Sequence, residues 1–172
     1  MHGEAVVELR RAVPTDAETV SRLLAESFAE LRAEYTAAAF AATVIGPEEA
    51  AHRMTEGPVW ICFLDGEAVA TGSVVVRGDG LYVRGMAVVP RARGRRVGWR
   101  LLEVMEEFAR RRRLARMYLS TTPFLDRAIR LYERCGFGRT DEPPHEMLGT
   151  PLFTMTKRVA SSAVDAADLP DT

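Results

Sequence analysis

The sequence contains few cysteines and no long apolar run. Its 172 residues include 2 cysteines, Cys62 and Cys135, which lie far apart and match neither a metal-binding spacing nor a disulfide framework. We therefore expect reduced thiols and no metal site. No segment approaches the roughly 18 apolar residues that cross a bilayer, and the N-terminus lacks the hydrophobic block of a secretory signal. These absences predict a cytoplasmic protein without a membrane partner.

The chain also lacks an excess of charge of either sign. Its formal net charge of -1 argues against attraction of the whole protein to nucleic acid or anionic lipid. Ten arginines nonetheless lie between Arg91 and Arg116, so a nucleic-acid-binding protein is one alternative. No aromatic stacking platform accompanies these arginines, and those at 110–113 suit the negative end of a helix dipole. We therefore expect no nucleic-acid partner, and we expect any anion site to be local.

The chain length and the hydrophobic pattern predict one domain over residues 1–159, followed by a disordered tail over 160–172. A strand is expected at 6–11. A helix should follow Pro14, with Thr15 and Glu18 at capping-box spacing. The alanine-rich stretch that follows offers no clear apolar stripe, and Pro47 resembles a helix start, so we expect a second helical segment there.

From residue 59 onward the sequence predicts strands and then alternating strands and helices. Apolar and β-branched runs indicate strands at 59–64, 68–76 and 81–89, the first two joined by an Asp65-Gly66 turn. Apolar spacing then predicts a helix at 97–113, a strand at 117–121, a helix at 124–136, a loop at 138–151 and a closing strand at 152–159. The fold class is therefore α/β (α+β): a mixed, mostly antiparallel sheet of six to seven strands, with helices on both faces.

A dense arginine cluster, VVPRARGRRVGWRLL over residues 88–102, joins the strand at 81–89 to the next helix. Backbone N–H groups at a helix start have no intrahelical partner, so a phosphate can bind there. Gly94 and Gly98 permit close approach of the backbone, and Arg93, Arg95 and Arg96 add charge. The spacing matches neither the ATP-binding loop nor the dinucleotide turn. The alternative is a solvated basic helix start.

Two motifs resemble the GCN5-related N-acetyltransferase (GNAT) family. The first, V-x-P-x-x-R-G-x-x-V-G-x-x-L-L, matches the acyl-CoA loop of that family at Val88, Pro90, Arg93, Gly94, Val97, Gly98, Leu101 and Leu102. The second, A-x-x-L-Y-x-x-x-G-F, matches at Ala128, Leu131, Tyr132, Gly136 and Phe137. The sequence departs from the family at Arg96, which stands where a loop glycine is usual, and it lacks an asparagine often found near the second helix.

The resemblance implies a sheet that splays between strands 4 and 5, with acetyl-CoA as the acyl donor inserted into the split. It implies direct acetyl transfer to a primary amine, with Tyr132 protonating the departing thiolate and a backbone N–H near Ala87 or Val88 binding the oxyanion. The residues implied to bind the coenzyme are Met86, Ala87, Val88, Arg93, Gly94, Arg95, Arg96, Val97, Gly98 and Ala128.

The interpretation of the chain as an enzyme leaves several questions open. A catalytically silent acyl-CoA-binding regulatory domain of the same fold is the main alternative. Glu26, Glu30 and Glu34 recur at helical spacing near the expected acceptor wall, but such a stripe is more typical of a solvated face. The loop containing His145 could close over the acceptor or be plain surface. The acceptor could be a small molecule or a peptide, the acyl group could be longer than acetyl, and the exposed sheet edges leave a homodimer open.

Overall fold

The middle of the chain forms the antiparallel strands that its apolar runs predict. In the computed structural model, which describes residues 5–160, these are β1 (Val7–Arg11), β2 (Val59–Leu64), β3 (Glu67–Arg77) and β4 (Gly80–Val88). Asp65 and Gly66 join β2 to β3 with φ values of 50° and 82°. Two successive left-handed residues suit a tight hairpin, which confirms the predicted turn.

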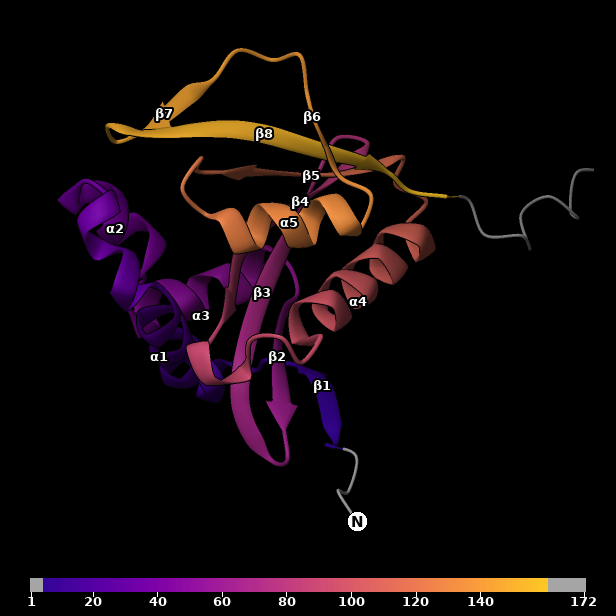
Figure 1. Ribbon diagram of the computed structural model, residues 1–172. Coiled ribbons are helices and arrows are strands. Elements are labelled where there is room, and N and C mark those ends of the chain that lie inside the picture. The colour runs from indigo at the N-terminus through magenta and orange to yellow at the C-terminus, as the bar shows by residue number, and fades with distance from the viewer. Residues whose placement is uncertain (1–4, 161–172) are drawn as a thin grey trace, which may run out of the picture.

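The second half of the described chain alternates between strands and helices, as the spacing predicts. Its elements are α4 (Val97–Arg111), β5 (Arg116–Thr121), α5 (Asp126–Arg134), β6 (Gly138–Arg139), β7 (His145–Met147) and β8 (Thr150–Arg158) (Figure 1). Gly136 ends the α5 region with a φ of 96°, as expected of a glycine at a helix stop. The loop assignment for 138–151 is partly wrong, because β6 and β7 lie within it.

The strands form one mixed sheet in the order β1-β2-β3-β4-β5-β8-β6, with β7 paired to β8. Every pairing is antiparallel except that of β4 with β5. The sheet thus has eight strands in the described chain, rather than six or seven. The difference comes from β6 and β7, whose two and three residues are too short to show an alternating pattern.

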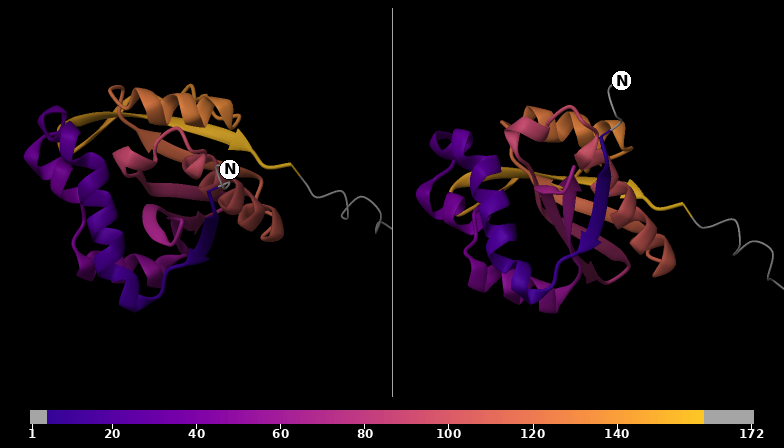
Figure 2. Two further views of the ribbon diagram at one scale, coloured as in Figure 1. Left: turned by 60° about the horizontal axis from the view of Figure 1, so that its bottom comes forward. Right: turned by 90° about the horizontal axis from the view of Figure 1, so that it is seen from below.

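Helices cover both faces of this sheet, as predicted. Successive residues of a strand point to opposite faces. A Cβ added to Gly72 of β3 would lie 2.5 Å from Cε of Met105, so α4 packs on that face. Thr71 and Ser73, the neighbours of Gly72, line a small cavity beneath α1 (Ala17–Phe28) and α3 (Pro47–Glu56) on the opposite face. Figure 2 shows α1 and α4 on opposite sides of the sheet.

The alanine-rich region between β1 and β2 forms more structure than expected. After α1 the chain forms the 3-10 turn η2 (Ala29–Glu34), the helix α2 (Ala37–Thr43) and then α3, which begins at Pro47. The expected second helical segment is therefore two helices. Thr36 caps α2, because its side chain accepts a hydrogen bond from the Ala39 N–H at 3.1 Å.

The start of α1 differs from the expected Thr15–Glu18 capping box. Instead, the chain first makes the 3-10 turn η1 (Pro14–Asp16), and the Asp16 carboxylate accepts a hydrogen bond from the Val13 N–H at 2.8 Å. The same carboxylate binds both terminal nitrogens of Arg10, at 2.8 and 2.9 Å. These contacts lower the pKa of Asp16 to about 2, with the Arg10 hydrogen bond as the largest cause. The helix start is therefore tied to β1 through one carboxylate.

Three further expectations concern the thiols, the membrane and the tail. Cys62 is buried and Cys135 half-buried, and both are free. Burial raises the pKa of Cys62 to about 11, so this thiol is unreactive at neutral pH. No helix among residues 5–160 has the length and apolar character needed to span a bilayer. The disordered tail expected over 160–172 lies outside the described residues from position 161 onward.

We predict that Asp16→Asn lowers the free energy of unfolding by about 1 to 2 kcal/mol at pH 7, discounted because the Arg10 partner is half-exposed. The folded pKa of Asp16 lies below the unfolded value of about 3.9. Its stabilisation is therefore complete above that value and disappears as the pH falls toward 2. Urea unfolding at pH 7 and pH 3 measures this. The exposed Asp141→Asn is the control, and an equal loss at both pH values would contradict the prediction.

Candidate active site

The strands β4 and β5 separate soon after they pair. Their parallel pairing covers only Gly80 with Arg116, Leu81 with Met117 and Tyr82 with Tyr118. Beyond Tyr82, β4 continues to Val88 while β5 turns away to follow β8, and the two directions are plain in Figure 1. One side of β4 over residues 83–88 therefore has no strand partner in the described chain. Its backbone groups are available to an extended ligand.

An irregularity in β4 adjoins this split. Thr71 pairs with Ala87 and Ser73 with Arg84, so Gly72 faces two residues, Gly85 and Met86. Gly85 has a φ of 62°. This bulge turns Met86 onto the α4 face, where its Sδ would lie 2.7 Å from a Cβ on Gly72. The small residues of β3 and β4 thus set the path of the strand at the split.

The arginine loop follows directly from the unpaired part of β4. After the 3-10 turn η3 (Pro90–Ala92), the chain passes through Gly94 with a φ of 77° and Arg96 with a φ of 60°, and α4 begins at Val97. The first helical bond of α4 runs from the Arg100 N–H to the Arg96 carbonyl, at 3.1 Å. The N–H groups that precede it have no intrahelical acceptor, which makes this helix start suited to a phosphate.

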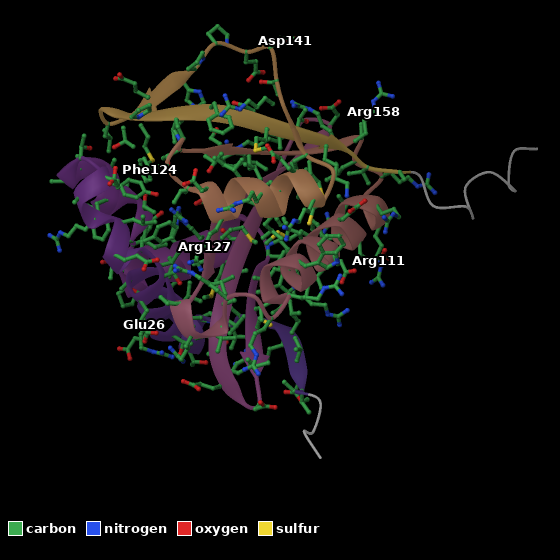
Figure 3. The ribbon with its side chains drawn as sticks, viewed as in Figure 1. Glu26, Arg111, Phe124, Arg127, Asp141 and Arg158 are labelled. Atoms are coloured by element: carbon green, nitrogen blue, oxygen red, sulfur yellow. The ribbon has the colours of Figure 1, made fainter. Side chains whose placement is uncertain are left out.

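Two of the loop arginines are neutralised by carboxylates. Arg91 donates to Glu26 at 2.9 Å and to Glu67 at 2.5 Å. Arg93 forms an ion pair with Glu30 and donates to the Ser27 carbonyl at 3.2 Å. These contacts anchor the loop to the end of α1, where Figure 3 labels Glu26. The four-residue spacing of the glutamates in the sequence was the signal for this role. Arg93 is thus held by η2 and the end of α1, and its expected contact with the phosphate stays a prediction.

The other arginines of the loop retain uncompensated charge. Arg95 is exposed and forms no ion pair or hydrogen bond with any residue between 5 and 160. Arg96 lies over the Trp99 ring, 5.5 Å from its centroid. Within the described part of the chain, Arg100 forms one ion pair, with Glu103 one turn along its own helix, at 3.3 Å. The positive charge beside the first turn of α4 therefore comes chiefly from Arg95 and Arg96.

The remaining predicted coenzyme residues occupy different environments. Val97 is 1% exposed, so its side chain belongs to the core and only its backbone faces the loop. Gly98 is helical rather than left-handed, and a Cβ there would lie 2.7 Å from Cδ2 of Leu131. Its role is to let α4 and α5 approach closely. Ala128 is half-buried on α5, and Ala87 is buried at the end of β4.

Tyr132 belongs to α5 and lies on its buried side, where it is 7% exposed. Its ring packs beside Phe137, with centroids 5.8 Å apart. Burial raises the pKa of Tyr132, and Tyr35, Cys135 and Tyr82 add smaller electrostatic contributions in the same direction. Tyr82 belongs to β4, and Tyr35 belongs to the segment between α1 and α2, so these phenols approach Tyr132 from other parts of the fold. A protonated hydroxyl is thus held inside the molecule near the split.

An aromatic cluster, which sequence analysis missed, stands beside these groups. Tyr35 packs edge-on against Phe28, Phe40 and Phe124, with ring centroids 6.2, 6.0 and 4.9 Å apart. Figure 3 shows Phe124, from the β5–α5 connection, beside α2. Burial raises the pKa of Tyr35 to about 12. No periodic pattern in the sequence connects these positions, because they meet only through tertiary packing.

His145 and the glutamate stripe have specific neighbours. His145 on β7 places Nε2 at 3.4 Å from the Ser120 hydroxyl at the end of β5. The loop before it thus lies over the outer strands, and closure over an acceptor stays a prediction. Glu26 and Glu30 bind loop arginines, whereas Glu34 is exposed. The stripe is therefore not simply a solvated face.

Comparison with known proteins agrees with this geometry. The family model described as "Acetyltransferase (GNAT) family" matches residues 18–137. A curated relative, the uncharacterized N-acetyltransferase YjgM of Escherichia coli strain K12, is 34% identical over 86 residues, which are 48% of this chain and 52% of the relative. The match thus spans about half the length of that relative.

Solved structures share the fold. The PaiA N-acetyltransferase of Thermoplasma acidophilum, in complex with coenzyme A, superposes with a TM-score of 0.76 at 16% identity, covering 89% of this chain and 99% of that one. The ribosomal-protein-S18-alanine N-acetyltransferase of Escherichia coli gives 0.71 at 17% identity, covering 96% and 100%.

We predict that Arg96→Gly raises the free energy of unfolding by about 0.5 to 1 kcal/mol, because glycine tolerates the left-handed conformation that strains arginine. The neighbouring Arg95→Gly is the control, since Arg95 has no positive φ and its replacement should lower stability by a few tenths of a kcal/mol. Urea unfolding measures both. Equal losses in the two variants would show that the conformation of Arg96 carries no strain.

Proposed function

Because the chain belongs to the acetyltransferase (GNAT) family, we propose that it transfers the acetyl group of acetyl-CoA directly to a primary amine. The observation that carries the proposal is the split between β4 and β5, which leads into the arginine loop at the start of α4. An unpaired strand edge and free helix N–H groups are the two features that a long molecule with amides and a diphosphate requires.

The residues present fit acetyl-CoA in this arrangement. The N–H groups at 97–99, with the charges of Arg95 and Arg96, suit the diphosphate. The unpaired edge of β4 at Met86, Ala87 and Val88 suits the amides of the pantetheine arm. Gly94 leaves open space in the loop, Gly98 lets α5 approach α4 closely, and Ala128 stands on α5. Arg93 holds the loop in position through Glu30.

The chemistry requires a neutral amine, a site for charge on the carbonyl oxygen, and a proton for the leaving thiolate. The amine attacks the thioester carbon, forming a C–N bond, and the C–S bond then breaks. A backbone N–H near Ala87 or Val88 would donate to the oxyanion. The Tyr132 hydroxyl would give its proton to the sulfur, and the proton lost by the amine would pass through solvent to the tyrosinate and restore the phenol. No base within the described chain is assigned to that last step.

The environment of Tyr132 affects its capacity as an acid. Its raised pKa keeps the hydroxyl protonated at neutral pH, which a proton donor requires. A phenol whose pKa lies far above that of the thiol would give up its proton to the thiolate unfavourably, since a solvated thiol has a pKa near 8.5. Burial makes this difference in pKa smaller, because it raises the pKa of a thiol as well; the buried thiol of Cys62, with a pKa of about 11, is an example.

We predict that the protein binds acetyl-CoA and releases free thiol when supplied with primary amines. A panel of small amines, amino acids and peptides, assayed by thiol release, measures turnover, while calorimetry at moderate ionic strength measures binding of the coenzyme. Binding without transfer to any amine would favour the silent acyl-CoA-binding domain. Absence of both would exclude the proposed function.

We predict that Tyr132→Phe lowers kcat by about 10 to 1000 fold, because the thiolate then leaves without its donor, while the affinity for acetyl-CoA changes little. Steady-state kinetics and calorimetry on the same preparation separate the two effects. Tyr118→Phe, a half-buried phenol of β5 whose ring packs with Tyr82 and Arg116, is the matched control and should keep full turnover. An unchanged kcat in Tyr132→Phe would remove this residue from the mechanism.

A further inference from the structure

Two arginines on the α1 and α3 side of the sheet lie against the β4 bulge. Arg53, from the last turn of α3, and Arg84, from β4, have side chains that are 15% and 18% exposed. The Nε atoms of both are buried without a hydrogen-bond partner between residues 5 and 160. Buried donors in folded proteins are almost always satisfied, so two orphaned guanidinium nitrogens at one place require an explanation.

The carboxylates nearby do not satisfy Arg53. Glu56 binds Arg84 at 2.6 Å, and it also faces His52 at 3.3 Å. Glu49, the carboxylate nearest to Arg53, lies 4.0 Å from Nε and is half-exposed. Burial lowers the pKa of Arg53, and the neighbouring charge of Arg84 lowers it further. A half-buried cation thus stands beside a second cation, with no acceptor for its own N–H groups in the described chain.

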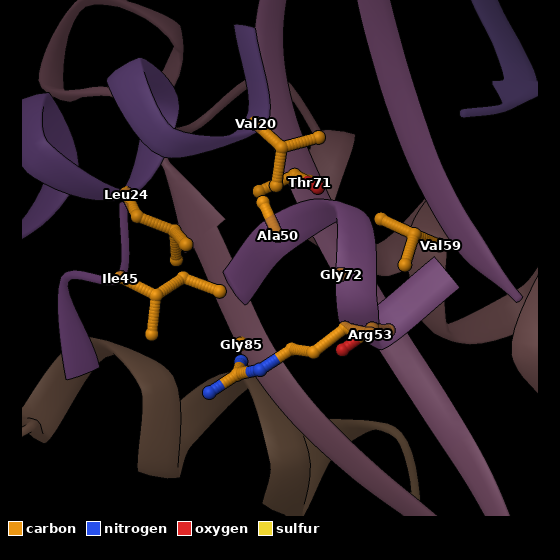
Figure 4. A pocket seen from close by; sticks show the side chains of 10 residues that line it. Val20, Leu24, Ile45, Ala50, Arg53, Val59, Thr71, Gly72 and Gly85 are labelled. Atoms are coloured by element: carbon orange, nitrogen blue, oxygen red, sulfur yellow. The ribbon is translucent and has the colours of Figure 1, made fainter. Parts of the chain in front are cut away.

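The guanidinium of Arg53 occupies space left by a glycine. A Cβ added to Gly85 would lie 3.1 Å from Nη1 of Arg53 and 3.6 Å from the Ser73 hydroxyl. Figure 4 shows the side chain reaching beneath Ile45 toward Gly85. The cavity beside it has a volume of about 10 Å³, which holds at most one water molecule. The protein itself therefore offers Arg53 little more than one solvent contact.

The location of Arg53 and Arg84 in the fold places this pair near the proposed site of acetyl transfer. Arg53 and Arg84 stand on the face opposite α4, whereas the acyl donor is proposed to enter the split from the α4 and α5 side. Gly85 lies two residues before Ala87, or roughly 7 Å along an extended strand. An anion held here would thus be several ångströms from the proposed site of acetyl transfer.

We propose that Arg53 and Arg84 bind a carboxylate of the acceptor, so that the acceptor is an amino acid or a related amine bearing an acidic group. This inference rests on the proposed function and names the substrate class of the same site. A carboxylate is the planar acceptor that matches a guanidinium fork, and the 15% exposed side chain of Arg53 forms no hydrogen bond with any residue between 5 and 160.

Acetyl transfer and direct binding test the substrate class with the same probes. The probes are straight-chain amino acids with two to six carbons, their carboxamides, and the corresponding aminoalkyl phosphonates. We expect at least one acid to exceed its carboxamide by about 10-fold or more in kcat/KM and in calorimetric affinity. Arg53→Gln should reduce that ratio to within about 2-fold, because kcat/KM and affinity for the acid fall.

Control variants separate the charge effect from loss of the fold. Arg111→Gln, at the exposed far end of α4 (Figure 3), should keep the full preference for the acid. Arg84→Gln should lose it, which gives a second reading if Arg53→Gln does not fold. Arg53→Met keeps the volume of the stem and removes the orphaned donors, so it should melt at the same temperature or higher. A fall of more than about 5 °C would assign Arg53 a structural role instead.

The outcomes distinguish the two proposals. If neutral amines are acetylated and no acid is preferred, or if the preference survives in Arg53→Gln, the carboxylate site is wrong while the acetyltransferase stands. If a phosphonate exceeds its carboxylate, the chemical class assigned to the site is wrong. If nothing is acetylated, the proposed function fails, and calorimetry of the acids against their carboxamides still decides whether the arginine pair binds a carboxylate.

Discussion

The limited pairing of β4 with β5 is the constraint on which the rest of the structure depends. Three residue pairs join these parallel strands, and then the sheet opens because β5 follows β8 rather than β4. A sheet interior normally leaves no backbone group unpaired. Here the open edge of β4 lies between its bulge and a helix start, so that main-chain donors occur along a continuous path. Most of the candidate donor site is thus made of backbone, positioned by where two strands part.

Some arginines of the loop hold the loop in place, and others remain available to bind a ligand. Arg91 is paired with Glu26 of α1 and Glu67 of β3, and Arg93 with Glu30 of η2, whereas Arg95 and Arg96 are left toward solvent. The paired arginines fix the loop before any ligand arrives, which lowers the ordering cost of binding. The strained conformation of Arg96 is consistent with this arrangement, because sites of binding commonly retain local conformations that stability alone would disfavour. The near-neutral chain thereby presents two arginines without carboxylate partners among residues 5–160 beside the start of α4.

Local patterns in the sequence predicted the long elements well and the short ones poorly. The Asp65-Gly66 hairpin, the stop at Gly136 and the apolar stripe of α4 each follow from residues adjacent along the chain. The strands β6 and β7 were missed because two or three residues carry no period, and Leu148 adopts a left-handed φ of 49° that its residue type does not suggest. The capping box failed for a tertiary reason, since Asp16 is held by Arg10 across the β1 boundary.

The same distinction divides the candidate site into two halves. The donor half consists of a strand end, a loop and a helix start that are consecutive in the chain, so a motif of fifteen residues reveals it. The proposed acceptor half brings together Arg53 of α3 and Arg84 of β4. These side chains meet only after folding, and no spacing along the sequence links them. The coenzyme could therefore be inferred from the chain alone, whereas the acceptor class requires the three-dimensional arrangement. The proposal of an acidic acceptor rests on that arrangement, because two like-charged guanidinium groups lie near each other and one of them, Arg53, has its nearest carboxylate 4.0 Å away.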